Sequence, residues 1–281
     1  MTDNSDDKNF PPGKRQYTLD FAYHGGIYRD VWMIGKSSVA ITDALEADKV
    51  AGGGVFVHFD NISGKKAEVY VDTEVHNSGK RTRTVAVETV LADAGDVPVK
   101  RVSQQVKLQA GESKTVRQRF AVRNPKLWSP DSPYLYRIQS RVKAGHEVLD
   151  GGVTRVGIRK AEFKGKDGFW LNGKPFGQLV GANRHQDFAY VGNALPNSQQ
   201  WRDAKRLRDA GCTIIRVAHY PQDPAFMDAC DEMGLFVIVA TPGWQYWNKN
   251  PEFAKLVHRN TREMIRRDRN HQCADVGAYF E

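Results

Sequence analysis

The sequence predicts a multidomain protein in which an all-β sandwich of immunoglobulin-like size comes before a parallel α/β sheet. Short runs of alternating apolar and polar residues recur from residue 37 to residue 158, with Gly, Asn, Asp and Pro between them. After residue 159 the pattern changes to strand and helix in turn. With 281 residues, of which 40% are hydrophobic and 26% charged, the chain is long enough for two domains.

The first region, residues 1–36, is expected to contain one pair of strands. The text YTLDFAYHGGIYRDVWMI, which begins at Tyr17, is typical of a strand, a Gly-Gly turn and a second strand. Two strands alone are marginally stable, so we expect them to belong to a larger sheet. The residues before Tyr17 contain no apolar segment of the signal-peptide kind.

The second region, residues 37–158, contains six runs with a period of two. This period is that of a strand with one buried face. Turn residues separate the runs, which is typical of an antiparallel sandwich. The runs are GGVFVHFDN, AEVYVDTEVHN, TRTVAVETVLAD, VKRVSQQVKL, SKTVRQRFAV and YLYRIQSRVKA.

The third region, residues 159–281, contains three strand-and-helix units, which predict a parallel sheet. The helix expected from Ser198 to Ala210 has apolar residues spaced by three, and Gly211 is placed to end it. The successive elements are FGQLVGANRH, SQQWRDAKRLRDAG, TIIRVAHY, PAFMDACDEMG, LFVIVATPG and PEFAKLVHRNTREMIRRD.

Composition argues against nucleic-acid and membrane partners. The formal net charge is +8, but the 41 Lys and Arg residues are spread among 33 acidic residues and form no basic stripe. No apolar run approaches the roughly 18 residues that span a bilayer, so we expect a soluble chain. No segment assigns a compartment.

The three cysteines, Cys212, Cys230 and Cys273, have neither CxxC spacing nor neighbouring histidines at metal-ligand spacing. We expect free thiols, two of them in a core, and no zinc site.

Polar side chains stand at the ends of the first two parallel strands. If these strands belong to a (β/α)8 barrel, their carboxyl ends face the active site. Histidine can donate to sugar hydroxyls and arginine can hold a carboxylate ionised, so the set suits polyhydroxylated ligands. A single His or Arg at a strand end more often has a structural role. When two neighbouring strand ends are both polar, a ligand-binding role is as good an interpretation as a structural one. The candidates are Asn183, Arg184, His185, Arg216, His219 and Tyr220.

The stretch GWQYW, which contains Trp244, Tyr246 and Trp247, follows the third strand. Its rings can stack on a pyranose or simply cover the rim of the sheet, and the sequence leaves both interpretations open. The sequence has no Ser-His-Asp order, phosphate-binding glycine loop or HExxH motif, and we predict no cofactor.

Four motifs are shared with a known family: GGIYRDVWMI, NPKLWSPDSPYLYRI, GIRKAEF with DGFWLNGKPFGQLVGANRHQD, and IIRVAHYPQDPAFMDACDEMGLFVIV. Together they resemble glycoside hydrolase family 2, the β-galactosidase and β-glucuronidase group. The first three are similar to the end of its sugar-binding jelly roll, its immunoglobulin-like domain and the start of its TIM (β/α)8 barrel. The fourth resembles the family signature and is the most specific.

This resemblance implies three domains and a set of sugar contacts. Residues 1–36 would be the remnant of the jelly roll, residues 37–158 the immunoglobulin-like sandwich and residues 159–281 a truncated first part of the barrel. Asp20 would contact the sugar from the jelly-roll side, and the strand-end residues and Trp244 would line the pocket.

The chain departs from the family pattern at three places. Thr213 stands where the signature usually has Asn, and Val217 stands where it has a small residue. VATPG occupies the place of the family's metal-binding acid, so the resemblance implies no metal.

The last residues depart from the pattern more strongly. In the family, RDRNH continues with Pro-Ser, an apolar fourth strand and Asn-Glu, whose Glu is the acid/base; here the chain reads HQCADVGAYFE. Loss of two bases from a coding sequence for the related text HPSVLMWEPILNE produces this reading and then a stop. We hypothesise a frameshift after His271 with Glu281 coincidental, which DNA sequencing across that codon tests.

The expected function is retaining hydrolysis of terminal β-glycosidic bonds by a β-galactosidase-like enzyme. Retention needs two carboxylates about 5–5.5 Å apart, and we expect this chain, without the family's two catalytic glutamates, to be inactive. Three barrel strands also present an open edge, so we expect aggregation or proteolysis with the sandwich surviving. The alternative is a non-catalytic carbohydrate-binding or adhesion module carried by the sandwich.

Overall fold

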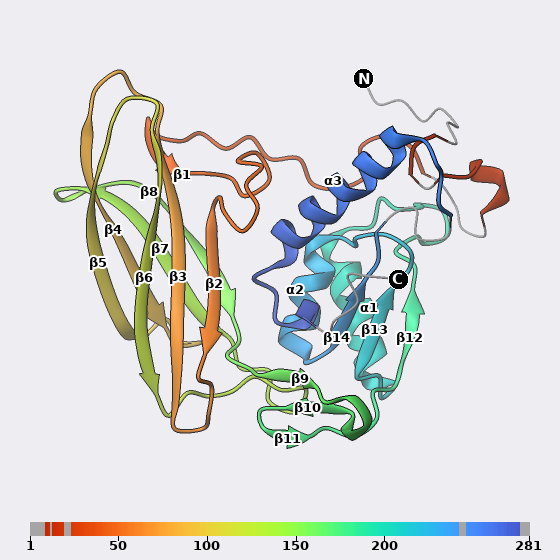
Figure 1. Cartoon of the computed structure of the whole chain (residues 1–281). Coiled ribbons are helices and arrows are strands. Elements are labelled where there is room, and N and C mark those ends of the chain that lie inside the picture. The colour runs from red at the N-terminus through yellow and green to blue at the C-terminus, as the bar shows by residue number, and fades with distance from the viewer. Residues whose placement is uncertain (1–8, 12, 20–23, 242–245, 276–281) are drawn as a thin grey trace. The chain divides into compact units, whose positions relative to one another are not determined.

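The computed structural model describes residues 9–11, 13–19, 24–241 and 246–275, which form two compact units (Figure 1). The sandwich unit comprises residues 33–178 and 266–272. The parallel-sheet unit comprises the remaining described residues. The domain boundaries at residues 36 and 158 stay a prediction. The two units are divided by compactness, which assigns the flanking residues 33–36 and 159–178 to the sandwich unit.

Two antiparallel sheets form the sandwich. The first has the order β1 (Val39–Ile41), β3 (Lys66–Asn77) and β2 (Val55–Asp60), with β6 (Ser113–Arg123) also paired to β3. The second has the order β5 (Pro98–Leu108), β4 (Arg83–Ala92), β7 (Tyr136–Ala144) and β8 (Glu147–Val156). The six expected runs all form strands, and the structure adds β1 and β8.

The inward-facing residues of both sheets form the sandwich core. Val71 from β3, Leu91 from β4 and Ile138 from β7 are fully buried in one cluster. Each such side chain contributes about 1.5–3 kcal/mol relative to an exposed one. Trp128 is also fully buried, and a Cβ on Gly157 would lie 2.8 Å from the Trp128 side chain, so the packing here requires glycine.

A small three-stranded sheet follows the sandwich within the same unit. It consists of β9 (Ala161–Phe163), β10 (Phe169–Leu171) and β11 (Lys174–Pro175). Asn172 and Gly173 join β10 to β11 with φ of 53° and 80°. Two consecutive positive φ values are those of a tight type I′ hairpin, for which Asn-Gly is the preferred sequence.

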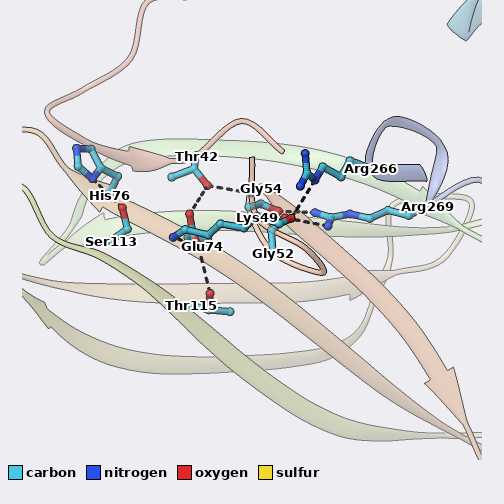
Figure 2. Close-up of polar contacts among 11 residues, drawn as sticks. Thr42, Lys49, Gly52, Gly54, Glu74, His76, Ser113, Thr115, Arg266 and Arg269 are labelled. Atoms are coloured by element: carbon cyan, nitrogen blue, oxygen red, sulfur yellow. Dashed lines mark hydrogen bonds and ion pairs between the residues drawn. The ribbon is translucent and has the colours of Figure 1, made fainter. Parts of the chain in front are cut away.

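A buried carboxylate organises the polar interior beside β1 and β2 (Figure 2). The Glu74 side chain is 3% exposed and pairs with Lys49 at 2.7 Å. Thr42 Oγ1 and Thr115 Oγ1 donate to the same carboxylate at 3.2 and 3.4 Å. This arrangement satisfies a buried charge that would otherwise be costly.

Two arginines attach residues 266–272 to the loop between β1 and β2 (Figure 2). Arg266 donates to the Lys49 carbonyl at 2.9 Å and pairs with Asp48 at 2.7 Å. Arg269 donates to the Gly52 carbonyl at 3.0 Å and to that of Gly53. Backbone carbonyls of a loop, which have no strand partner, are thereby satisfied by guanidinium donors.

Asn270 completes the free edge of β2. Its Oδ1 accepts from the Val57 N–H at 3.0 Å, and its Nδ2 donates to the Val55 carbonyl at 2.9 Å. A side-chain amide thus replaces the two hydrogen bonds that a neighbouring strand would supply at this edge.

The parallel-sheet unit contains β12 (Gly181–Arg184), β13 (Ile214–Val217) and β14 (Phe236–Val239) in that order, all parallel. Its helices are α1 (Asn197–Asp209), α2 (Pro224–Met233) and α3 (Pro251–Asp268). The three expected strand-and-helix units are confirmed. A Cβ on Gly181 would lie 1.6 Å from the Ile214 carbonyl oxygen, so the close approach of β12 to β13 needs glycine.

Local signals in the sequence set the bounds of α2. Asp223 caps its start by accepting from the Ala225 N–H at 2.9 Å, and Pro224 occupies the first turn. Gly234 ends the helix in the left-handed conformation at φ 71°. Phe226 and Met227 on this helix are fully buried among strand and helix residues.

The expected strand pair between Tyr17 and Trp32 is wrong for the described residues. They contain one short 3-10 helix, η1 (Gln16–Thr18), and no strand from residue 24 to residue 36. Val31, Trp32 and Met33 are 75%, 78% and 101% exposed. The β-forming residue types are present, but no sheet in the described part of the chain pairs with them.

The cysteines are free thiols, as expected, and Cys230 and Cys273 lie in a core. Burial raises the pKa of the Cys230 thiol well above its ordinary value. None of the helices in the described ranges combines the length and the apolar composition required to cross a bilayer.

Candidate sugar-binding site

Strand register divides the candidate residues between the two faces of the parallel sheet. Asn183 lies beside Arg216, which lies beside Ile238, whereas Arg184 lies beside Val217. Because side chains alternate along a strand, these two rows point to opposite faces. Val217 is fully buried in the core shared with the helices, so the Asn183–Arg216 row faces away from the helices.

Arg184 lies among the helices. Its side chain is 5% exposed and pairs with Asp203 at 2.7 Å, and it donates to Gln200 at 2.8 Å. The guanidinium also lies over the Phe226 ring, 4.0 Å from its centroid. The geometry therefore gives Arg184 a structural role in place of the expected sugar contact.

Arg216 and His219 form a direct hydrogen bond of 2.8 Å between Nη1 and Nδ1. A guanidinium only donates, so His219 Nδ1 accepts. The hydrogen of this neutral imidazole is consequently on Nε2. β13 ends at Val217, and the peptide between Ala218 and His219 is cis.

His185 lies between the two strand-end aromatic residues. Its ring centroid is 5.3 Å from that of His219 and 6.4 Å from that of Tyr220, both edge to face. His185, His219 and Tyr220 are all partly buried. Three of the predicted residues are thus brought together at the carboxyl ends of β12 and β13.

Tyr220 is a neutral donor at physiological pH. Burial raises the pKa of its phenol, and the nearby Asp187 and Tyr28 raise it further, against a hydrogen bond with the Gln186 backbone and the charge of Arg184. A phenol that stays protonated can donate to a ligand oxygen over the whole neutral range.

Two expected contacts, Asp20 and Trp244, lie outside the described residues. Of the other aromatic residues after β14, Tyr246 is 45% exposed and Trp247 is 61% exposed. Trp247 and Phe253 pack edge to face with centroids 5.7 Å apart, so part of the Trp247 ring is already in contact within the protein.

Sequence reasoning missed Arg29 and Gln186. Arg29 donates to Gln186 Oε1 and to the Pro221 carbonyl, directly beside the predicted histidine and tyrosine. Sequence patterns carry no direct signal for this contact, because GGIYRD indicates a turn between strands and, within GGIYRDVWMI, resembles the end of the family's jelly roll.

As a chemical surface, the described strand ends offer hydrogen-bond donors. Two carboxylates near the strand ends are engaged elsewhere, since Asp223 caps α2 and Asp203 pairs with Arg184, whereas Asp187 is exposed beside Tyr220. A set of imidazole, phenol and guanidinium donors suits neutral hydroxyl-rich ligands or a carboxylate brought by another segment.

Comparison with known proteins decides the family. Residues 54–159 match Glycosyl hydrolases family 2, and residues 162–274 match the TIM barrel domain of Glycosyl hydrolases family 2. The chain belongs to this family. Its sandwich is the family's immunoglobulin-like domain, and β12, β13 and β14 are strands of the family's TIM barrel domain.

The chain is similar over most of its length to curated β-galactosidases and β-glucuronidases. It is 34% identical to a β-galactosidase of Thermoanaerobacter pseudethanolicus, with 97% of this chain and 34% of the relative covered. It is 30% identical to a β-glucuronidase of Bacteroides fragilis, with 79% of this chain and 31% of the relative covered. The chain therefore spans about a third of the length of these relatives.

Solved structures of β-glucuronidases are also similar to this chain. The crystal structure of Bacteroides uniformis β-glucuronidase matches with a TM-score of 0.87 at 29% identity, over 97% of this chain and 32% of that one. Parabacteroides merdae β-glucuronidase matches with a TM-score of 0.82 at 27% identity, over 97% of this chain and 33% of that one.

Proposed function

We propose that the protein serves the retaining hydrolysis of terminal β-glycosidic bonds and that this chain supplies sugar-contacting residues for it. The observation that carries the proposal is the Arg216–His219 hydrogen bond, with His185 at ring-contact distance, at the carboxyl ends of two barrel strands. Names of the related proteins support the reaction class.

Each residue has a distinct part in this proposal. His219 donates from Nε2 to a sugar hydroxyl, since Arg216 occupies Nδ1. The positive charge of Arg216 keeps ionised a carboxylate that another segment brings beside it. His185 and Tyr220 supply further polar contacts beside them, and Asn183 belongs to the same row as Arg216.

The proposed sugar is a β-galactoside, with a β-glucuronide as the competing substrate. The related proteins carry both names. A glucuronide brings a carboxylate, for which Arg216 is a suitable partner, whereas a galactoside brings only hydroxyls. Comparing the two sugars therefore tests the assignment directly.

The chain by itself is proposed to bind sugar without hydrolysing it. Hydrolysis with retention requires an acid/base and a nucleophile, two carboxylates about 5–5.5 Å apart. Near the described strand ends, Asp203 and Asp223 are held in an ion pair and a helix cap, and the exposed Asp187 beside Tyr220 is one carboxylate where two are needed.

The experiment measures binding and turnover with the purified chain. We expect isopropyl β-D-thiogalactopyranoside to bind by calorimetry and 4-nitrophenyl β-D-galactopyranoside to remain uncleaved. His219→Ala should weaken binding about tenfold or more by removing a hydrogen bond. Val153→Ala, at a 61% exposed position on the sandwich, is the matched control.

Two results would contradict the proposal. Release of nitrophenol by the pure chain would show that it holds its own catalytic carboxylates. Binding that survives both Arg216→Ala and His219→Ala would assign the sugar to the sandwich and favour the carbohydrate-binding module. The sandwich rings of His58 and Tyr70 stack on each other, with centroids 4.8 Å apart, which leaves these faces unsuited to a sugar.

A further inference from the structure

Arg29 connects the two loops that carry the candidate site. Its Nη2 donates to the Pro221 carbonyl at 2.7 Å, directly after Tyr220. The same nitrogen donates to Gln186 Oε1 at 3.2 Å, directly after His185. One guanidinium therefore holds the loop after β12 and the loop after β13.

Gln186 is the centre of this connection. Its side chain is 1% exposed, and its Oε1 also accepts from the Asp223 N–H at 3.2 Å. Two donors on one oxygen fix the orientation of the amide. Among the described residues its Nε2 has no hydrogen-bond acceptor, so the Oε1 contacts alone anchor the side chain.

Two other described residues of the N-terminal segment contact the parallel-sheet unit. Asn197, at the start of α1, donates to Asp30 at 3.1 Å. A Cβ on Gly192 would lie 2.6 Å from the His24 ring, so this side chain lies against the Gly192 backbone. Contacts of His24, Arg29 and Asp30 thus hold a stretch without regular secondary structure against the parallel-sheet unit.

We propose that Arg29 and Gln186 are positioning residues for the sugar site, which set the separation of His185 from Tyr220. This inference rests on the proposed function for its purpose, and on the hydrogen bonds for its geometry. Arg29 acts through Gln186 and the Pro221 carbonyl and need not touch the sugar. A charged donor is suited to the task because its hydrogen bonds are stronger than neutral ones.

Hydrogen exchange of the full chain tests the positioning independently of the sugar. Arg29→Ala and Gln186→Leu should each speed exchange of the Asp223 amide about tenfold, because a buried hydrogen bond is lost or loosened. Gln186→Glu keeps the acceptor and should restore slow exchange. Val31→Ala, at a 75% exposed position in the same segment, should change nothing.

The binding measurement then separates positioning from folding. Arg29→Ala should weaken isopropyl β-D-thiogalactopyranoside about tenfold, with Gln186→Glu near the wild-type affinity. Unchanged exchange at Asp223 in Arg29→Ala would overturn the inference. Equally fast exchange throughout α1 and β13 would overturn it too, since Arg29 would then only stabilise the unit. If the wild type binds no sugar, the proposed function fails while exchange still decides the role of Arg29.

Discussion

Two buried charges, one in each unit, are balanced in different ways. In the sandwich, the buried carboxylate of Glu88 is surrounded by cations that reach the solvent, Arg101, Arg141 and Lys143 at 3.3 to 3.9 Å. In the parallel-sheet unit, Arg184 is a buried cation held by polar groups under the helices. The charges around Glu88 lie outside the apolar core of the sandwich, whereas Arg184 lies within the core of its unit.

The two units also differ in how many faces of their sheets serve the core. Both sheets of the sandwich turn an apolar face inward, and its core is enclosed by its own strands. The parallel sheet buries one face against its helices, and the row through Asn183 and Arg216 lies on the other. We infer that the sandwich supplies stability and that the strand ends supply recognition. Substitutions in each unit test this division.

Trp128→Ala should have the largest effect. The side chain is fully buried in the sandwich unit, so its removal should lower the free energy of unfolding by about 3–5 kcal/mol. Thermal denaturation, followed by the circular dichroism of the backbone, measures the change in the free energy of unfolding. Site-resolved hydrogen exchange should show it in β3 and β7 before β13; equal loss of protection in both units would mean that they unfold as one.

Asp203→Asn should destabilise the parallel-sheet unit by about 3 kcal/mol, because the buried Arg184 would lose its charged partner. Urea denaturation measures this change. Affinity for isopropyl β-D-thiogalactopyranoside, measured well below the transition, should be retained. Weakened affinity in the folded variant would return Arg184 to the sugar site.

Arg216→Lys should show the opposite behaviour. Lysine keeps the charge but not the fork of donors, so the bond to His219 and its tautomer are lost. We expect about 1.5–3 kcal/mol less sugar-binding free energy, with the melting temperature unchanged. Arg206→Lys, at an exposed position on α1, is the control and should leave both quantities unaltered.

These two arginines show what the sequence can and cannot predict. Barrel-end reasoning predicts that His185, Arg216 and His219 lie together, because parallel strands bring their carboxyl ends to one edge, and these side chains are in contact. It also groups Arg184 with them, whereas the period of two places this residue on the opposite face, where it pairs with Asp203. Arg29 was not predictable, since its bond to Gln186 joins positions 157 residues apart.

The strands show the same limits. Alternation located six sandwich strands, because one face of each is buried. It missed β1, which has only three residues, and β8, whose Gly151-Gly152 pair interrupts the pattern. Residues 24–32, where the second strand of the expected pair would lie, form no strand, because local propensity cannot supply a partner strand.

Asn270 offers a finer test of the sandwich. Asn270→Asp keeps the acceptor for the Val57 N–H but loses the donor to the Val55 carbonyl, whereas Asn270→Ala loses both. We expect Asn270→Ala to cost about 1 kcal/mol and to speed exchange at Val57. Asn270→Asp should leave the Val57 amide slow; fast exchange in both would mean that the acceptor contributes nothing.

The smallest effect is expected from Glu68→Gln. Hydrogen bonds from Lys66, Arg119 and Asn61 lower the pKa of Glu68 from 4.5 to about 2. A lowered folded-state pKa contributes stability that is present above pH 4.5 and is lost as the pH falls toward 2. The variant should therefore be slightly less stable than wild type at pH 7 and equal to it near pH 2 by thermal melts. Glu147→Gln is an exposed control.

The division between stabilising sandwich and recognising strand ends is tested most directly by hydrogen exchange of the wild-type chain with and without isopropyl β-D-thiogalactopyranoside. We expect slower exchange confined to residues 183–188 and 216–223, with β2, β3 and β6 unchanged. Protection confined to the sandwich strands would contradict it and would place sugar recognition in the sandwich.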